Sequence, residues 1–188
     1  MTAFQPGSIR AQFPSDTEET AVPVRLTANG QPVEFPVDPW RSLADVLRRK
    51  LGLPGTTVGC ESGSCGTCTV LVDGAPVRAC LMLAVQADGA AVETVESLAV
   101  GGKLNELQQA FQEHGALQCG FCTPGFLMLG TELLRREPAA DRERIRECVA
   151  ANLCRCTGYA GIVDAIASLA APGPEGPASE SSSMRGTA

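Results

Sequence analysis

The stretch of sequence that decides the fold is Gly59–Cys80, which reads Gly-Cys-Glu-Ser-Gly-Ser-Cys-Gly-Thr-Cys-Thr-Val-Leu-Val-Asp-Gly-Ala-Pro-Val-Arg-Ala-Cys. Cys60, Cys65 and Cys68 follow the spacing Cys-x4-Cys-x2-Cys, and Cys80 comes after 11 more residues. This spacing is typical of plant-type [2Fe-2S] clusters, in which four cysteine thiolates hold two irons. The sequence therefore predicts that this loop and Cys80 together bind one cluster.

Three glycines, Gly59, Gly63 and Gly66, lie among the first three cysteines. A chain that wraps a small cluster must turn repeatedly, and glycine adopts the positive φ values that such turns need. Without a Cβ, the backbone amides can also come close to sulfur, and hydrogen bonds to sulfur help to set the reduction potential. We therefore expect this loop both to hold the cluster and to tune it.

The residues on either side of the loop predict a mixed sheet with one helix packed across it. Apolar and polar residues alternate before and after Asn29-Gly30, which is a strong signal for a tight hairpin turn. A helix is expected at residues 42–51, where leucines recur at helical spacing and basic residues precede Gly52. The expected strands are residues 24–28, 33–37, 69–72 and 92–95. We assign residues 23–98 to one domain.

Beyond residue 98 the hydrophobic period becomes helical and predicts a second domain, residues 99–171, built as a small four-helix bundle. Four helices are expected. The first has Leu104, Leu107 and Phe111 on one face and a stop at Gly115, and the second runs to Arg136 with Thr123 as N-cap and Pro124 as its first residue. The third is capped by Asp141 and runs to about Leu153, and the fourth runs from about Tyr159 to Ala170. Residues 1–22 are expected to be a disordered tail and residues 172–188 a flexible one. The predicted fold class is α+β.

The second domain carries four more cysteines in two pairs, Cys119 with Cys122 and Cys154 with Cys156, separated by 31 residues. Two helices and a turn fill that separation, so the pairs are expected to meet at neighbouring helix junctions. Helix N-termini carry a partial positive charge that favours thiolates. Four thiolates would hold a second [2Fe-2S] cluster, and the same pairing also fits a structural zinc site. The neighbouring plant-type loop favours the cluster.

Composition excludes several functional classes. The formal net charge of -6 argues against a nucleic-acid partner, which would require a basic surface. No apolar run approaches the about 18 residues of a membrane span, and the first residues lack the apolar core of a secretory signal, so we expect a cytoplasmic protein. Because that compartment keeps thiols reduced, metal binding explains nine cysteines better than disulfides do.

Three motifs give the chain a resemblance to a known family. They are Cys-Glu-Ser-Gly-Ser-Cys-Gly-Thr-Cys at residues 60–68, Gln-Cys-Gly-Phe-Cys-Thr-Pro-Gly at 118–125, and Asn-Leu-Cys-Arg-Cys-Thr-Gly-Tyr at 152–159. In this order they resemble the iron-sulfur subunit of the molybdenum hydroxylases, the family of xanthine oxidase and aerobic carbon monoxide dehydrogenase. The resemblance implies an N-terminal β-grasp ferredoxin domain followed by a four-helix bundle.

The resemblance also implies an electron relay within a larger complex. Substrate would be hydroxylated at a molybdenum-pterin centre in a large subunit, and FAD in a medium subunit would receive the electrons. The implied carriers are first the cluster of Cys119, Cys122, Cys154 and Cys156, and then that of Cys60, Cys65, Cys68 and Cys80. Gln118 matches the glutamine that hydrogen-bonds the pterin in the family. A dimer of heterotrimers is expected, and a zinc-binding interaction module or a free-standing two-cluster ferredoxin are the alternatives.

Three residues outside these motifs also bear on metal binding. Cys148 is expected to be a small buried apolar side chain rather than a ligand. His114 is the only histidine, and a Rieske-type cluster needs two, so His114 is expected to be structural or solvent-facing. Trp40 is assigned no function, and the chain offers no acid, base or nucleophile set for substrate chemistry.

Overall fold

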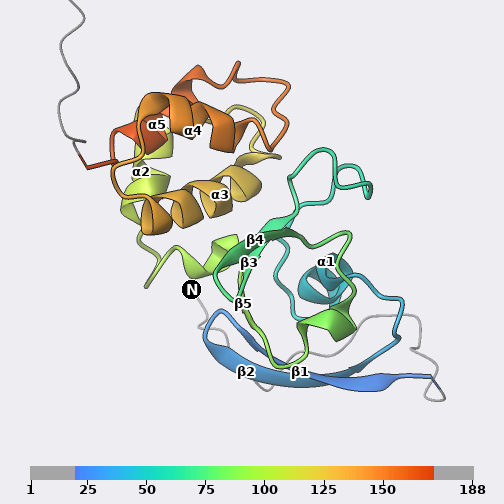
Figure 1. Ribbon diagram of the computed structural model, residues 1–188. Coiled ribbons are helices and arrows are strands. Elements are labelled where there is room, and N and C mark those ends of the chain that lie inside the picture. Colours follow the sequence, from blue (N-terminus) through green and yellow to red (C-terminus); the bar gives the residue numbers. More distant parts are fainter. Residues whose placement is uncertain (1–19, 172–188) are drawn as a thin grey trace, which may run out of the picture.

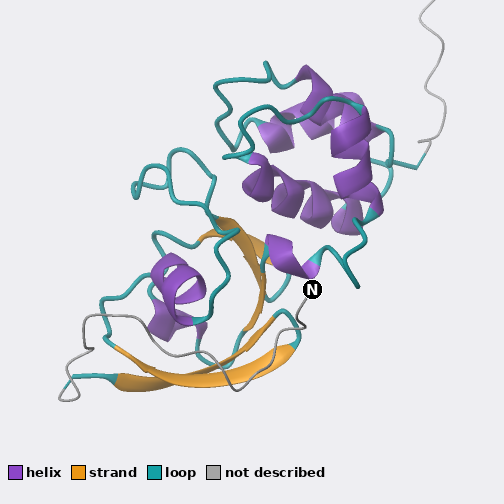
Figure 2. Ribbon diagram, turned by 180° about the vertical axis from the view of Figure 1, so that it is seen from behind, coloured by secondary structure: helices purple, strands orange, loops and turns teal. Residues whose placement is uncertain are grey.

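The computed structural model describes residues 20–171 of the chain. The two predicted tails, residues 1–22 and 172–188, lie outside this range apart from residues 20–22. Figure 1 and Figure 2 show a curved sheet with one helical segment against it, and a group of helices beside the sheet. The α+β class predicted from the sequence is therefore confirmed.

The N-terminal hairpin forms as predicted. β1 (Val22–Ala28) pairs antiparallel with β2 (Gln31–Val37). The turn residues Asn29 and Gly30 both have positive φ, at 50° and 79°, which is the geometry of a type I′ turn and matches the twist of the two strands. Alternate side chains of both strands are buried, so the hairpin has one face in the core.

Three short strands complete the sheet: β3 (Thr69–Val72), β4 (Ala75–Arg78) and β5 (Ala91–Glu93). The strand order is β2-β1-β5-β3-β4. β5 pairs parallel with β1 and antiparallel with β3, so it joins the two hairpins into one sheet. The expected closing strand is thus present, although it begins one residue earlier than predicted and is shorter.

The helix expected at residues 42–51 is not a uniform α-helix. It begins as α1 (Leu43–Asp45), with the Ser42 hydroxyl accepting a hydrogen bond from the third helical amide at 3.1 Å. It continues as a π-helical turn, Val46–Lys50, in which the Leu51 amide bonds back five residues. A π turn holds one more residue than an α turn, so the hydrophobic spacing alone could not reveal it.

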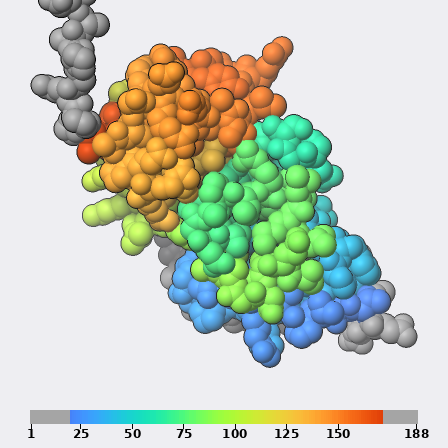
Figure 3. Space-filling model, in the orientation of Figure 1, coloured from blue at the N-terminus to red at the C-terminus, as the bar shows by residue number. Residues whose placement is uncertain are grey.

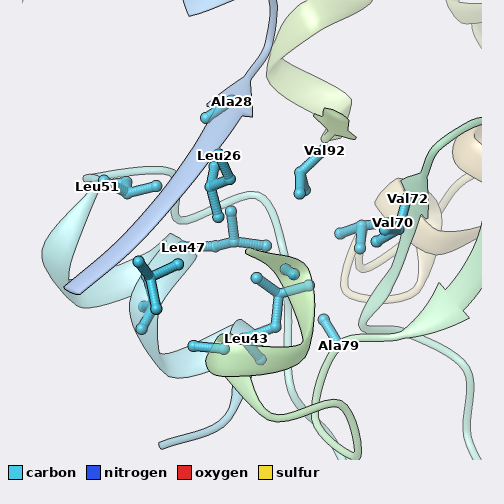
Figure 4. Close-up of a cluster of buried hydrophobic side chains, with 14 of the residues drawn as sticks. Leu26, Ala28, Leu43, Leu47, Leu51, Val70, Val72, Ala79 and Val92 are labelled. Atoms are coloured by element: carbon cyan, nitrogen blue, oxygen red, sulfur yellow. The ribbon is translucent and has the colours of Figure 1, made fainter. Parts of the chain in front are cut away.

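The first hydrophobic core lies between this helical segment and the sheet (Figure 4). Leu43 and Leu47 are fully buried and lie near Leu26 of β1 and Val70 of β3. Full burial of such a side chain contributes about 1.5–3 kcal/mol. The chain enters the cysteine loop from this helical segment and leaves it into β3, so this core fixes both ends of the loop.

Within residues 20–171, four α-helices follow the sheet. They are α2 (Glu106–Glu113), α3 (Thr123–Arg136), α4 (Arg142–Val149) and α5 (Ala160–Ala167). They surround a second core that includes Phe111, Phe126, Ile145 and Ile166. None of the helices that the structure describes is long and apolar enough to cross a lipid bilayer.

Several helix ends differ from the prediction. Leu104 precedes the capping residue Asn105 and is 37% exposed, so it is not part of the buried face of α2. Cys122, rather than Thr123, is the N-cap of α3, and α4 ends at Val149. The N-cap of α5 is Tyr159, which has a φ of 68° and thus a left-handed conformation rare for a bulky residue.

Figure 3 shows the C-terminal segments packed against the N-terminal ones, and the two halves of the chain touch through β3 and α3. Val70 and Val72 belong to the first core, whereas Leu71 between them is buried in the second, because successive strand residues point to opposite faces. Arg135 of α3 donates two hydrogen bonds to Glu93 of β5, at 2.9 Å and 3.0 Å. Strand β3 therefore links the sheet to the helices.

We expect Leu71→Ala to destabilise the protein by about 2–5 kcal/mol, the usual cost of emptying a buried leucine site. Leu81→Ala is the matched control, because Leu81 is 56% exposed and the expected change is within about 0.5 kcal/mol. Urea unfolding followed by circular dichroism measures both. Equal stability of the two variants would contradict a packing role for Leu71 between the halves.

Candidate metal centres

The first cysteine group lies at one end of the sheet. Cys60, Cys65 and Cys68 are in the loop between α1 and β3, and Cys80 follows β4 directly. The Cys65 amide donates to Cys60 Sγ at 3.4 Å, and the Cys80 and Cys68 thiols are neighbours. The fold thus brings the four predicted ligands to one place.

The sulfur of Cys60 is surrounded by amide donors. The Cys65 and Ser62 amides each lie 3.4 Å from Cys60 Sγ, and they lower the pKa of the Cys60 thiol to about 6. At the other end, burial and then the neighbouring Cys68 raise the pKa of Cys80 to about 11. In the free thiol form, Cys60 therefore ionises more easily than Cys80.

The glycines of the loop have two different roles. Gly63 and Gly66 have positive φ, at 79° and 72°, as predicted. Gly59 does not, but a Cβ there would lie 3.2 Å from both Cys65 Sγ and the Phe121 ring, a tight contact that glycine avoids. Glu61 also has a positive φ, 54°, which the sequence did not reveal.

The second cysteine group meets at the ends of the helices, where Figure 1 shows the α4–α5 loop on the same side as the loop of the first group. Cys156 and Cys119 sulfurs lie 3.6 Å apart, and Cys122 and Cys154 are neighbours. The fold thus brings together two pairs of cysteines that are 37 and 32 positions apart in the sequence.

The pairing of the sulfurs fits an iron-sulfur cluster. A tetrahedral metal with metal–sulfur bonds of about 2.3 Å places its sulfurs about 3.8 Å apart, close to the separation of Cys119 and Cys156. Each iron of a [2Fe-2S] cluster takes two protein thiolates, so two close pairs are the required arrangement. Within residues 20–171, no three His, Cys, Asp or Glu side chains converge as ligands of a single ion.

Cys154 is held by two residues of its own loop. The Thr157 hydroxyl and amide lie 3.1 Å and 3.4 Å from Cys154 Sγ, and these donors outweigh burial and lower the pKa of the thiol. The Cys154 amide donates to the Tyr159 hydroxyl at 2.9 Å. Both residues lie in the motif at residues 152–159, but the sequence alone did not predict their contacts with Cys154.

Exposure gives the second group an inner and an outer side. Cys119 and Cys156 are exposed, and so is Gln118 beside them. Cys122 is half-buried at the N-terminus of α3, and burial followed by its contact with Cys154 raises its pKa to about 12. The outer pair and Gln118 therefore share one surface of the molecule.

Three further residues were considered from the sequence: Cys148, His114 and Trp40. Cys148 is half-buried in α4 and packs against the second core, and burial raises the pKa of its thiol. His114 is exposed at the end of α2. Trp40 is 61% exposed. None of the three belongs to a cysteine pair described above.

Comparison with known protein families assigns each half of the chain to a family of cluster-binding domains. Residues 26–98 match the family described as "2Fe-2S iron-sulfur cluster binding domain", and residues 94–167 match the "[2Fe-2S] binding domain" family. Two separate cluster-binding domains account for the two cysteine groups. They favour two [2Fe-2S] clusters over the zinc alternative.

Several characterised proteins are similar over most of their length. Caffeine dehydrogenase subunit gamma of Pseudomonas sp. (strain CBB1) is 55% identical over 150 residues, 78% of this chain and 89% of that protein. The nicotine 6-hydroxylase small subunit of Paenarthrobacter nicotinovorans is 52% identical over 163 residues, 87% of this chain and 94% of that protein. Both names describe one subunit of a larger oxidoreductase.

A solved structure agrees with these relatives. Quinoline 2-oxidoreductase from Pseudomonas putida 86 contains a chain that superimposes with a TM-score of 0.78 at 53% identity, covering 80% of this chain and 93% of that one. The sequence motifs, the two cysteine groups and the comparisons lead to one assignment. This chain carries two [2Fe-2S] clusters and belongs to the family of electron-transferring iron-sulfur subunits of the molybdenum hydroxylases.

Proposed function

We propose that this chain passes electrons one at a time from a molybdenum-pterin centre in a large partner subunit to FAD in a medium partner subunit. When bound, the clusters supply one-electron redox chemistry, and the chain binds them and sets their surroundings. The observation that carries the proposal is the presence of two groups of thiols, each already brought together by the fold. The subunit names of the similar proteins support it.

The proposed ligands are the eight cysteines of the two groups. They are Cys60, Cys65, Cys68 and Cys80 for the N-terminal cluster, and Cys119, Cys122, Cys154 and Cys156 for the C-terminal cluster. Close pairing of the sulfurs in the second group supports this assignment. In the first group, the amides directed at Cys60 are suited to stabilise a thiolate ligand.

The exposed residues of the second cysteine group support the order of carriers that the family resemblance implies. Gln118, Cys119 and Cys156 share one exposed surface, so we propose that this surface faces the pterin of the large subunit, with Gln118 hydrogen-bonding the pterin. The N-terminal cluster would then deliver electrons to the flavin. The N-cap position of Cys122 supports a cluster at this end of the helices, because a helix N-terminus favours negative charge.

The domain division and the assembly belong to the same proposal. Residues 23–98 would form the β-grasp domain and residues 99–171 the four-helix bundle, each with its own hydrophobic core. The complex would be a dimer of heterotrimers. We place it in the cytoplasm, a compartment that keeps cysteine thiols reduced and available as cluster ligands.

Names of similar proteins suggest a substrate class for the complex. Caffeine, nicotine and quinoline all contain a nitrogen heterocycle. We propose that the large subunit hydroxylates a compound of this class, although the present chain contributes no residue to that pocket. Substrate screening of the purified complex with an artificial electron acceptor tests this proposal, and activity on aldehydes alone would contradict it.

Changing Cys156 to Ser tests the ligand assignment. A lost thiolate should release the C-terminal cluster, so iron should fall from about four to about two atoms per chain and one of two spin-resonance signals should disappear. Cys148→Ser is the control, because it removes a neighbouring thiol that we exclude as a ligand, and both clusters should remain. Full iron content in Cys156→Ser would contradict the assignment.

Thr157→Val tests how the loop tunes the C-terminal cluster. The reduced cluster carries more negative charge, so losing the hydroxyl near Cys154 Sγ should lower its reduction potential. Thr157→Ser keeps the hydroxyl and should restore the potential, and the N-terminal cluster should be unaffected in both variants. Redox titration followed by spin resonance measures each cluster separately. An unchanged potential in Thr157→Val would show that this hydrogen bond has no tuning role.

A further inference from the structure

The two cysteine loops meet directly, through the backbone. The Leu153 amide donates a hydrogen bond to the Cys65 carbonyl at 2.8 Å. Cys65 belongs to the first cysteine group, and Leu153 is bonded to Cys154 of the second. One hydrogen bond and the backbone atoms of these residues therefore form a continuous route between the two groups.

The loops approach so closely because two glycines leave room. An added Cβ at Gly66 would lie 1.8 Å from Asn152 Oδ1, and one at Gly125 would lie 2.6 Å from the Gly66 carbonyl oxygen. Gly66 follows Cys65 directly, and Gly125 lies in the first turn of α3, just after Cys122. Each glycine thus lies near a cysteine of a different group. A side chain at Gly66 would displace Asn152, and one at Gly125 would displace the backbone at Gly66.

Asn152 fills the space between these glycines. Its side chain is 1% exposed, and neither Oδ1 nor Nδ2 has a hydrogen-bond partner among the described residues. A buried amide without partners costs stability, so packing is the contribution that this side chain makes here. It lies against Gly66 on one loop and Gly125 on the other.

Two more hydrogen bonds hold the contact on either side of Asn152. The Arg78 guanidinium donates to the Ala151 carbonyl at 2.6 Å, and the Thr57 hydroxyl donates to the Phe121 carbonyl at 2.8 Å. Both join the N-terminal half to the loops of the C-terminal cysteines. The Cys65–Leu153 bond is therefore part of a fixed arrangement of backbone groups.

We propose that Asn152, Gly66 and Gly125 form a positioning element that sets the electronic coupling between the two clusters by holding the Cys65–Leu153 hydrogen bond closed. The step that depends on it is the transfer of a single electron from one cluster, which is oxidised, to the other, which is reduced, with no bond broken. This role rests on the proposed function and its two ligand sets. Asn152, Gly66 and Gly125 are not ligands themselves.

Gly125→Ala is the most direct test, because alanine suits a helix and the added Cβ would press on the Gly66 carbonyl at 2.6 Å and on Asn152 Nδ2 at 2.9 Å. Gly130→Ala is the matched control: it lies in the same helix, and the nearest atoms to its Cβ would be side-chain atoms of Leu107 and Ile166, at 3.2 Å and 3.3 Å. Both variants are made in the complete complex. Iron content and the separate spin-resonance signals show first whether both clusters are present.

The coupling is read from the rate at which a flash-injected electron equilibrates between the two clusters. We expect Gly125→Ala to slow the equilibration, and Gly130→Ala to keep the wild-type rate. A wild-type rate in a Gly125→Ala complex with both clusters would overturn the proposal.

Asn152→Ala provides the second variant, and it decides the question if Gly125→Ala does not load both clusters. Removing the Asn152 side chain should slow the equilibration while iron content stays complete, and an unchanged rate would overturn the proposal. The ligand assignment is judged separately, because its failure would appear as missing iron or a missing signal, whereas failure of the present inference would appear as intact clusters with unchanged coupling.

Discussion

The structure depends on one constraint: sulfur atoms from distant parts of the chain must come within about 4 Å of each other, the spacing that a tetrahedral metal requires. Cys119 and Cys156 satisfy it across 37 residues. No local hydrogen bond could impose such a contact on a flexible chain. The contact is imposed by two hydrophobic cores, which fix the helix and strand ends from which the cysteine loops begin. Strand β3 contributes side chains to both cores.

Much of this arrangement could be predicted from local sequence. The hairpin turn at Asn29-Gly30, the cap at Asp141 and the cysteine spacings each depend on residues close together in the chain, and the structure has the expected turn and cap. The family assignment from three short motifs is confirmed by both domain matches. These features were predictable because backbone conformation and capping are local properties.

Other features depend on contacts between distant residues, and the sequence did not reveal them. The π-helical turn at Val46–Lys50, the left-handed conformation of Tyr159 and the role of Cys122 as an N-cap are set by how neighbouring segments pack. The Asn152 side-chain amide has no hydrogen-bond partner among the described residues because it is buried between Gly66 and Gly125, and this packing joins segments far apart in the sequence. The glycine pattern around the cysteines indicated close approach to sulfur, but it did not indicate close approach between the loops.

The proposed electron-transfer role requires that the purified protein hold two distinct [2Fe-2S] clusters. Iron and sulfide analysis of the purified protein, combined with low-temperature spin resonance after reduction, measures this directly. The account predicts about four irons per chain and two separate rhombic signals that each integrate to about one spin. A single signal with about two irons per chain, or a zinc-containing protein without iron, would contradict it.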